Sequence, residues 1–89
     1  MIWQPKSIVN TVIVAKAIEG HRLQLTFSDG SVRIFDATPY LEKGIFTELQ
    51  DPNYFRDFKI AFGTVQWPNE QDFAPETLYL ESEILDLKK

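Results

Sequence analysis

The sequence predicts a small α+β domain, in which an antiparallel β-meander of about five strands carries two or three short helical turns on one face. The first half supports this fold class with β-branched and alternating apolar residues around an Asp29-Gly30 turn signal. The second half supports it with prolines where short helices are expected to begin. The chain has 89 residues, of which 44% are hydrophobic and 13% aromatic, so residues 1–89 are expected to form one domain.

A three-stranded antiparallel meander is expected between residues 8 and 36. Residues 8–18 are rich in β-branched side chains, which favour a pleated strand over a helix. Glu19-Gly20 and Asp29-Gly30 are interpreted as two-residue turns on either side of the alternating segment 21–27. The facing pairs that follow are Phe27 with Val32, Leu25 with Ile34, Leu23 with Asp36, Val14 with Leu25, and Val12 with Phe27. One apolar face is then expected to hold Val12, Val14, Leu25, Phe27, Val32 and Ile34.

Short helices and strands are expected after the meander, where the apolar period changes. Thr38-Pro39 predicts a helix over residues 39–43 that ends at Gly44, because a capping residue followed by proline is typical of a helix start. Asp51-Pro52 repeats this pattern for residues 52–56. The remaining segments are interpreted as strands at 58–62 and 64–67, a loop at 68–71, and a helix at 76–79 after Pro75. Residues 84–89 are compatible with a helix, a strand or a frayed tail.

Composition and charge argue against several classes of partner. The net charge of −4 comes entirely from the last twenty residues, which hold six carboxylates and two lysines, and the nine basic residues are scattered. Direct nucleic-acid binding and attraction to an anionic membrane are therefore not expected. With no cysteine, one histidine and four glycines, the sequence indicates no metal site, no cofactor and no nucleotide-binding loop. The N-terminus lacks the apolar segment of a signal peptide, so a cytoplasmic location is expected.

Several short motifs occur in a specific order along the chain. They are Leu25-Thr26-Phe27-Ser28-Asp29-Gly30, Phe35-Asp36, Pro39-Tyr40-Leu41, Gly44-Ile45-Phe46 with Leu49, Phe55, Phe58, Gly63-Thr64-Val65-Gln66-Trp67, and Asp72-Phe73-Ala74-Pro75-Glu76-Thr77-Leu78-Tyr79. In these motifs the chain resembles domain-of-unknown-function family 2442, an uncharacterised bacterial family. The resemblance implies a small α+β domain that occurs alone or ahead of a helix-turn-helix DNA-binding domain. It implies no catalytic residues, and none is assigned.

Four residues are candidates for a binding site: Trp67, Asp72, Glu76 and Tyr79. The two carboxylates are four residues apart and share one helix face if the helix begins early enough. The two aromatic rings are then expected to wall an acidic pocket. The alternative is structural, with the carboxylates at a helix start and the rings in the core.

Three other polar residues receive structural interpretations. His21 is expected to be a solvent-exposed residue at the start of a strand. Asp29 is assigned to the turn because aspartate tolerates left-handed backbone geometry, and Asp36 is expected to cap the entry into the Thr38-Pro39 turn. The two aspartates lie at opposite ends of the hairpin, which is too far apart for a cooperating carboxylate pair.

Two classes of function are compatible with these features. The first is a non-enzymatic protein-interaction or regulatory module, acting in sensing or dimerisation or as a toxin–antitoxin-like partner. It would use an exposed sheet edge or some of the aromatic residues Phe46, Tyr54, Phe55, Phe58 and Phe62, which otherwise serve as core. The second is a small-molecule-binding domain or minor enzyme at the four candidate residues, which a deep cavity beside them would favour.

Self-association is expected if the strand in residues 8–18 lies at a sheet edge. That segment is long and apolar, and Lys16 is its only charge, so it lacks the features that protect edges from pairing. A helix, the arm of residues 1–6 or another subunit would cover it, and Trp3 with the surface aromatic residues would supply area to an interface between two copies. The alternative is that the strand lies inside the sheet and the protein is a monomer.

Overall fold

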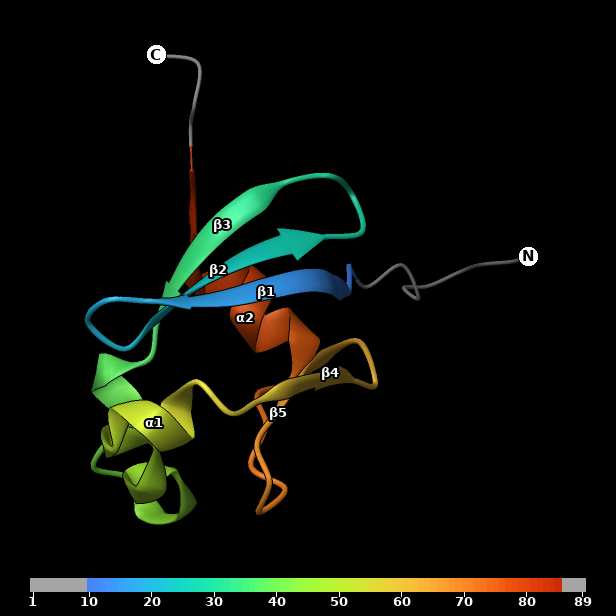
Figure 1. Ribbon diagram of the computed structural model, residues 1–89. Coiled ribbons are helices and arrows are strands. Elements are labelled where there is room, and N and C mark those ends of the chain that lie inside the picture. Colours follow the sequence, from blue (N-terminus) through green and yellow to red (C-terminus); the bar gives the residue numbers. More distant parts are fainter. Residues whose placement is uncertain (1–9, 86–89) are drawn as a thin grey trace.

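The computed structural model describes residues 10–85 and has an α+β fold, as the sequence predicts (Figure 1). An antiparallel four-stranded sheet has the order β1-β2-β3-β6, and β4 and β5 form a second sheet of two strands. The strands are β1 (Val12–Ile18), β2 (Arg22–Phe27), β3 (Val32–Asp36), β4 (Lys59–Ala61), β5 (Thr64–Gln66) and β6 (Glu83–Ile84). The helical elements are α1 (Pro52–Phe55), α2 (Pro75–Glu81) and the 3₁₀ segments η1 (Thr38–Tyr40) and η2 (Gly44–Gln50).

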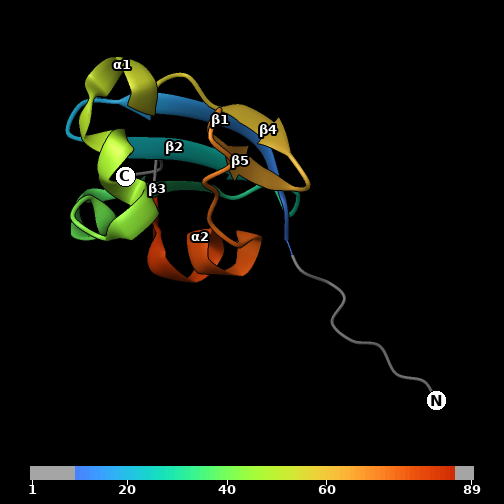
Figure 2. The same ribbon diagram turned by 90° about the horizontal axis from the view of Figure 1, so that it is seen from below.

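Both α-helices and the β4–β5 hairpin lie on the same face of the four-stranded sheet. Figure 2 shows them in front of β1, β2 and β3 when the molecule is seen from that side. The core fills the space between these layers and consists of Val12, Leu23, Leu25, Phe27, Phe35, Ala37, Leu49, Phe55, Val65, Trp67, Phe73 and Leu78. Residues from both halves of the chain therefore depend on one another for burial. No helix within residues 10–85 is long and apolar enough to cross a membrane.

The β2–β3 hairpin has a three-residue loop, so the register predicted from a two-residue turn is wrong by one residue. The Phe27 amide donates to Ser31 O at 2.9 Å, and the Gly30 amide donates to Phe27 O at 2.8 Å. Gly30 has a φ of +89°, which completes a turn followed by a left-handed residue, the common geometry of three-residue hairpin loops. The observed facing pairs are Thr26 with Val32, Leu25 with Arg33, Gln24 with Ile34, Leu23 with Phe35, and Arg22 with Asp36.

The β1–β2 hairpin also has a three-residue loop, Glu19-Gly20-His21, and His21 adopts a φ of +58°. As a result Val14 faces Thr26, and the predicted pairing of Val14 with Leu25 is wrong. The predicted pairing of Val12 with Phe27 is confirmed because an irregularity between Val12 and Val14 shifts the register back.

These registers change which side chains enter the core. Because side chains alternate along a strand, a shift of one residue moves them to the other face. Leu25 is fully buried as predicted, but Val14 is 54% exposed, and Val32 and Ile34 are only half-buried. Phe35 enters the core instead, at 1% exposure, where its ring meets Phe73 with centroids 5.0 Å apart.

The helix starts are partly as predicted. The Asp51 side chain accepts from the Asn53 amide at 2.9 Å and caps α1, which confirms that prediction. Asp36 lies at the entry into the Thr38-Pro39 turn as expected, and its Oδ1 accepts from the Thr38 amide at 2.9 Å, although Asp36 is not the N-cap of η1. Thr38 itself makes no cap, because η1 begins at this residue and Ala37 occupies the N-cap position. Gly44 begins η2 rather than ending a helix, so that prediction is wrong.

The last part of the chain completes both sheets. The predicted strands around Gly63 are present as β4 and β5, but they pair with each other and not with the main sheet. The fourth strand of the main sheet is β6, which pairs with β3 and ends at Ile84, the first residue of the segment 84–89 whose structure the sequence left open. The predicted helix after Pro75 is α2. Residues 1–9, which include the predicted N-terminal arm and the start of the first strand, and residues 86–89 lie outside the described residues.

Candidate functional site

Trp67, the first candidate binding residue, is part of the core. Its side chain is 1% exposed, and its Nε1 donates to the Phe55 carbonyl at 2.8 Å. The indole stacks on Phe55 with centroids 5.9 Å apart and meets Phe73 edge-on at 6.0 Å. Because its one polar hydrogen is already donated, Trp67 offers a ligand little beyond an apolar edge.

Tyr79 lies elsewhere, over the β2–β3 loop. Its Oη donates to Asp29 Oδ2 at 2.6 Å, and its ring meets Phe27 edge-on at 5.0 Å. The Arg33 guanidinium lies over the Tyr79 ring at 3.8 Å from the centroid, and Arg33 Nε donates to Ser31 Oγ at 3.0 Å. These contacts attach α2 to the β2–β3 hairpin.

Asp29 receives hydrogen bonds that favour its charged form. Besides Tyr79 Oη, its carboxylate accepts from the Ser31 hydroxyl at 2.7 Å and the Ser31 amide at 2.9 Å. The bond from Tyr79 and the two bonds from Ser31 lower the pKa of Asp29 to about 2. The role of Asp29 therefore extends beyond the turn geometry inferred from the sequence.

Asp72 and Glu76 are both exposed and do not share a helix face. The helix α2 begins at Pro75 with Ala74 as its N-cap, so Asp72 precedes it. Asp72 instead forms an isolated bridge with Gln66. The four candidate residues are thus divided, with Trp67 in the core and Tyr79 bound to the β2–β3 loop.

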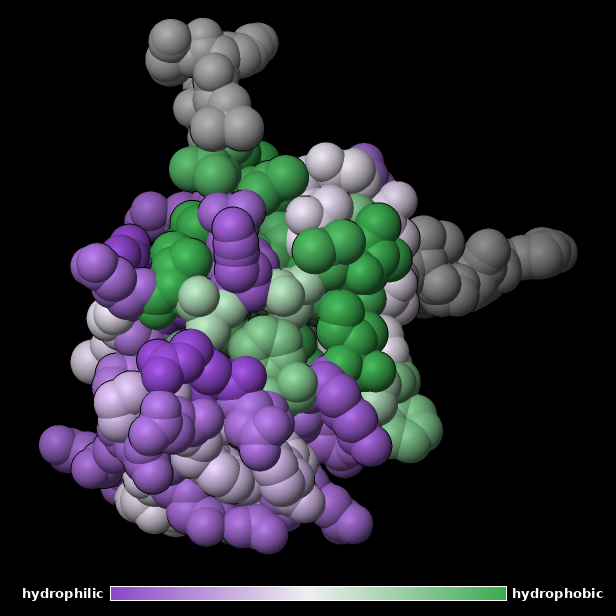
Figure 3. All heavy atoms as spheres, in the orientation of Figure 1, coloured by the Kyte–Doolittle hydropathy of each residue, from purple (hydrophilic) through white to green (hydrophobic). Residues whose placement is uncertain are grey.

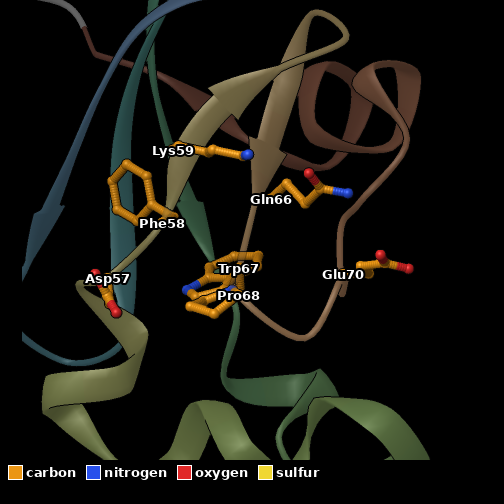
Figure 4. A pocket seen from close by; sticks show the side chains of 7 residues that line it. All are labelled: Asp57, Phe58, Lys59, Gln66, Trp67, Pro68 and Glu70. Carbon is orange, nitrogen blue, oxygen red and sulfur yellow. The ribbon is translucent and has the colours of Figure 1, made fainter.

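A hollow of about 420 Å³ lies beside Trp67. Its lining consists of Asp57, Phe58, Lys59, Gln66, Trp67, Pro68 and Glu70, which Figure 4 shows around the β4–β5 hairpin. Of the four candidate residues, only Trp67 contributes. Asp57, Lys59, Pro68 and Glu70 are exposed, so the hollow is an open depression. Within residues 10–85, no group of three or more histidine, cysteine or acidic side chains is placed to hold a metal ion.

The buried side chain of Gln71 is the centre of a polar network. The sequence predicted only a loop at this residue and did not indicate the network. Gln71 is 2% exposed, and its Nε2 donates to Ile45 O at 2.9 Å and to Glu48 Oε1 at 2.7 Å. Its Oε1 accepts from Tyr54 Oη at 2.7 Å. Asn69 Nδ2 donates to both oxygens of Glu48, at 2.7 and 2.9 Å. Each of these polar groups has a hydrogen-bond partner, so a structural role is sufficient to explain the network.

A second hollow, of about 460 Å³ and likewise open to solvent, lies between the β1–β2 loop and α1. We call it the α1 cavity, and its lining residues are Ala17, Ile18, Glu19, Gly20, His21, Pro52, Phe55 and Arg56. His21 is half-buried here and not exposed as expected. Its Nε2 donates to Gln50 O at 3.1 Å, and its ring meets Phe55 edge-on at 5.1 Å.

Exposed apolar side chains gather at the opposite end of β1 and on the β4–β5 hairpin. We call them the β1 patch, which consists of Ile13, Val14, Ile60 and Phe62. Figure 3 shows hydrophobic residues on the right of this face, over β1 and the hairpin, above a hydrophilic region. Phe62 is 86% exposed, the largest fraction among the exposed large hydrophobic residues. In the aromatic series, Phe55 is buried and Phe46, Tyr54 and Phe58 pack against the core.

Phe62 occupies a backbone position that disfavours it. The strand pair Ala61–Thr64 leaves Phe62-Gly63 as a two-residue loop, with φ values of +56° and +78°. Positive φ at both positions defines a type I′ turn, in which Asn-Gly is preferred. The sequence contains a signal for this exposed ring. Phe62 precedes Gly63 between two predicted strands, where a tight turn would place its side chain at the tip of a hairpin.

Comparison with known proteins yields one match. A family model described as "Protein of unknown function (DUF2442)" matches residues 12–83. This span contains every described strand except the last residue of β6. No curated protein and no solved structure matches the chain significantly.

Proposed function

The chain belongs to the DUF2442 family of proteins of unknown function, and on that premise we propose that it is a non-enzymatic protein-interaction module. The proposed binding surface is the outer edge of β1 together with the β1 patch. The exposure of Phe62 in a backbone conformation that disfavours it is the observation that carries this proposal.

The open edge of β1 supports the proposal. Among residues 10–85, the sheet order gives β1 a strand neighbour on the β2 side only. At its first residue, the Val12 amide donates to Gly63 O at 2.9 Å, so the β4–β5 hairpin occupies that end. Over the rest of β1 the sole charge is Lys16. A strand edge that carries apolar side chains is the geometry to which extended segments of other chains add.

The strain at Phe62 supports it further. A non-glycine residue in the left-handed region costs roughly 1–2 kcal/mol. Asparagine would lower that cost at this turn position and would remove an exposed aromatic ring. Strained residues that keep an exposed side chain are typical of functional sites, and aromatic side chains are typical anchors of protein interfaces.

A regulatory role, in sensing or dimerisation or as a toxin–antitoxin-like partner, is the finer form of this proposal and would use the same surface. The alternative, a small-molecule-binding domain or minor enzyme, has the hollow beside Trp67 in its favour. It is less well supported, because Asp72, Glu76 and Tyr79 do not line that hollow. A small-molecule library that shifts the Trp67 indole signal in NMR spectra would favour this alternative.

Site-specific photocrosslinking in living cells tests the proposal. The full chain is produced in cells of its source organism with benzoylphenylalanine at position 62, or at Glu76 as the control on exposed α2 surface. A protein adduct formed from position 62 and absent from position 76 is expected. Equal incorporation at both positions with no protein adduct at 62 contradicts the proposal.

A further inference from the structure

Building on the proposed function, we infer that the partner at the β1 edge is a second copy of this chain, and that Phe62 of each copy enters the α1 cavity of the other. The two features that would meet, an exposed aromatic side chain and an apolar cavity, lie at opposite ends of the same strand. The positions of the ring and the cavity in the fold, their chemistry and a two-fold symmetry between the copies support this contact.

Phe62 is held at the Val12 end of β1. The adjacent Gly63 accepts the Val12 amide hydrogen through its carbonyl oxygen at 2.9 Å. Gly63 also approaches Thr11 so closely that an added Cβ would lie 2.8 Å from Thr11 Cγ2. The hairpin tip is therefore seated against the start of β1, while the Phe62 ring remains 86% exposed.

The α1 cavity lies at the Ile18 end of β1. Ala17, Ile18, Pro52 and Phe55 give it apolar surface, and its volume of about 460 Å³ is ample for a phenyl ring. Glu19 and Arg56 are its exposed charged lining residues, one of each sign, so the opening carries no net charge from them. An aromatic side chain is a suitable occupant of such a cavity.

A two-fold axis brings these features together. When two β1 strands lie side by side and antiparallel, the Val12 end of one copy meets the Ile18 end of the other. Figure 1 shows the β4–β5 turn and the β1–β2 loop at opposite ends of β1. The same contact then forms twice, and the assembly closes as a dimer. A contact between one ring and one cavity without this symmetry would leave the second pair free and extend into a chain of copies.

The contact would use apolar surface that each copy exposes to solvent. A standard interface removes about 800 Å² from each partner. Burial of one Phe62 ring accounts for on the order of 150 Å² of this, and each copy contributes both a ring and a cavity. Ile13, Val14 and Ile60, which are 56%, 54% and 42% exposed, lie in the same patch and add to that area. The contact would also cover the edge of β1, whose sole charge is Lys16.

Sedimentation equilibrium of the purified full chain over a range of micromolar concentrations tests the dimer. We expect a mass of twice the 10.3 kDa of one chain. Phe62→Glu is expected to weaken the dimer at least tenfold, because it removes the aromatic ring and places a charge against the apolar surface of Ala17, Ile18 and Phe55. Leu80→Glu is the matched control, since Leu80 is 78% exposed on α2. Circular dichroism verifies that both variants fold.

Three results of this experiment would overturn the inference. They are a wild-type mass of one chain throughout, a dimer that folded Phe62→Glu leaves unchanged, and a dimer that Leu80→Glu weakens as much as Phe62→Glu does. In the first case, a crosslink from position 62 to a different protein in cells would leave the proposed function standing. No protein crosslink from that position would contradict both.

Disulfide trapping tests the contact itself, since the chain has no cysteine of its own. Phe62→Cys and Arg56→Cys are purified separately, mixed and oxidised. We expect a disulfide-linked heterodimer in this mixture, and far less in a mixture of Phe62→Cys with the exposed control Glu76→Cys. Equal yields in the two mixtures would overturn the placement of Phe62 in the α1 cavity.

Discussion

The hydroxyl of Tyr79 donates a 2.6 Å hydrogen bond to the carboxylate of Asp29, across 50 residues of sequence. Both residues belong to motifs that carry the resemblance to the family, yet neither lines a described cavity. Their contact attaches α2 to the loop between β2 and β3. These two motif residues therefore have a structural explanation in the assembly of the fold.

The first prediction concerns pH. Because the folded-state pKa of Asp29 is lowered from 3.8 to about 2, its contribution to stability is present above pH 3.8 and is lost as the pH falls toward 2. Tyr79→Phe removes the first cause of this shift and should raise the pKa of Asp29 toward 3.8. A carboxyl NMR titration measures the change. Tyr54→Phe, which loses a bond to Gln71 instead, should leave that pKa unchanged.

The second prediction concerns the register of the main sheet. Leu25→Ala should reduce the free energy of unfolding by about 2–5 kcal/mol, because Leu25 is fully buried. Val14→Ala should cost less than about 1 kcal/mol, because Val14 is 54% exposed on the other face. Urea denaturation measures both changes. Similar losses in the two variants would contradict the difference in burial between Leu25 and Val14.

The third prediction concerns the buried network of Gln71. Gln71→Leu removes the partner of Tyr54 Oη and a donor to Ile45 O. It should lower the free energy of unfolding by about 1–3 kcal/mol, because it removes the part-buried hydrogen bonds that Gln71 makes to Tyr54, Ile45 and Glu48. Gln24→Leu makes the same chemical change at a half-buried position on the main sheet and should be nearly neutral. Equal losses at the two positions would show that the network contributes little.

The fourth prediction concerns the strain at Phe62. Phe62→Asn should raise the free energy of unfolding of the monomer by about 1 kcal/mol, since asparagine suits the left-handed position. Phe62→Ala should bring no such gain, because alanine is strained there as well. Both should weaken self-association. Thermal unfolding at low micromolar concentration measures the stability of the monomer, and sedimentation measures self-association. A Phe62→Asn variant less stable than the wild type would argue against strain in this turn.

The fifth prediction is that this chain alone does not bind nucleic acid. Its basic residues are scattered and its last twenty residues carry the net negative charge. Fluorescence anisotropy with duplex DNA at about 150 mM salt should show no saturable binding at concentrations where non-specific binders have affinities of ~10⁻⁴–10⁻⁶ M. Saturable micromolar binding would contradict the argument from charge.

The sequence by itself determined the features that depend on nearby residues. Asp29-Gly30 indicates a hairpin because few residues accept positive φ, and Asp51-Pro52 indicates a helix start because the aspartate can cap the amide that follows proline. The burial of Leu25 and the α+β class follow from apolar alternation in the first half and short proline-marked helices in the second. These preferences act over a few residues, and distant parts of the chain do not alter them.

Only the tertiary structure decided the length of the two loops, and with it the register. An Asp-Gly pair suits loops of two or three residues, so local energies do not choose between them. The choice depends on which face packs best, and the observed register buries Phe35 against Phe73 from the second half of the chain. The cavity beside α1 and the exposure of Phe62 likewise arise where distant segments meet. No pattern along the sequence specifies such a surface, because its parts become neighbours only when the chain folds.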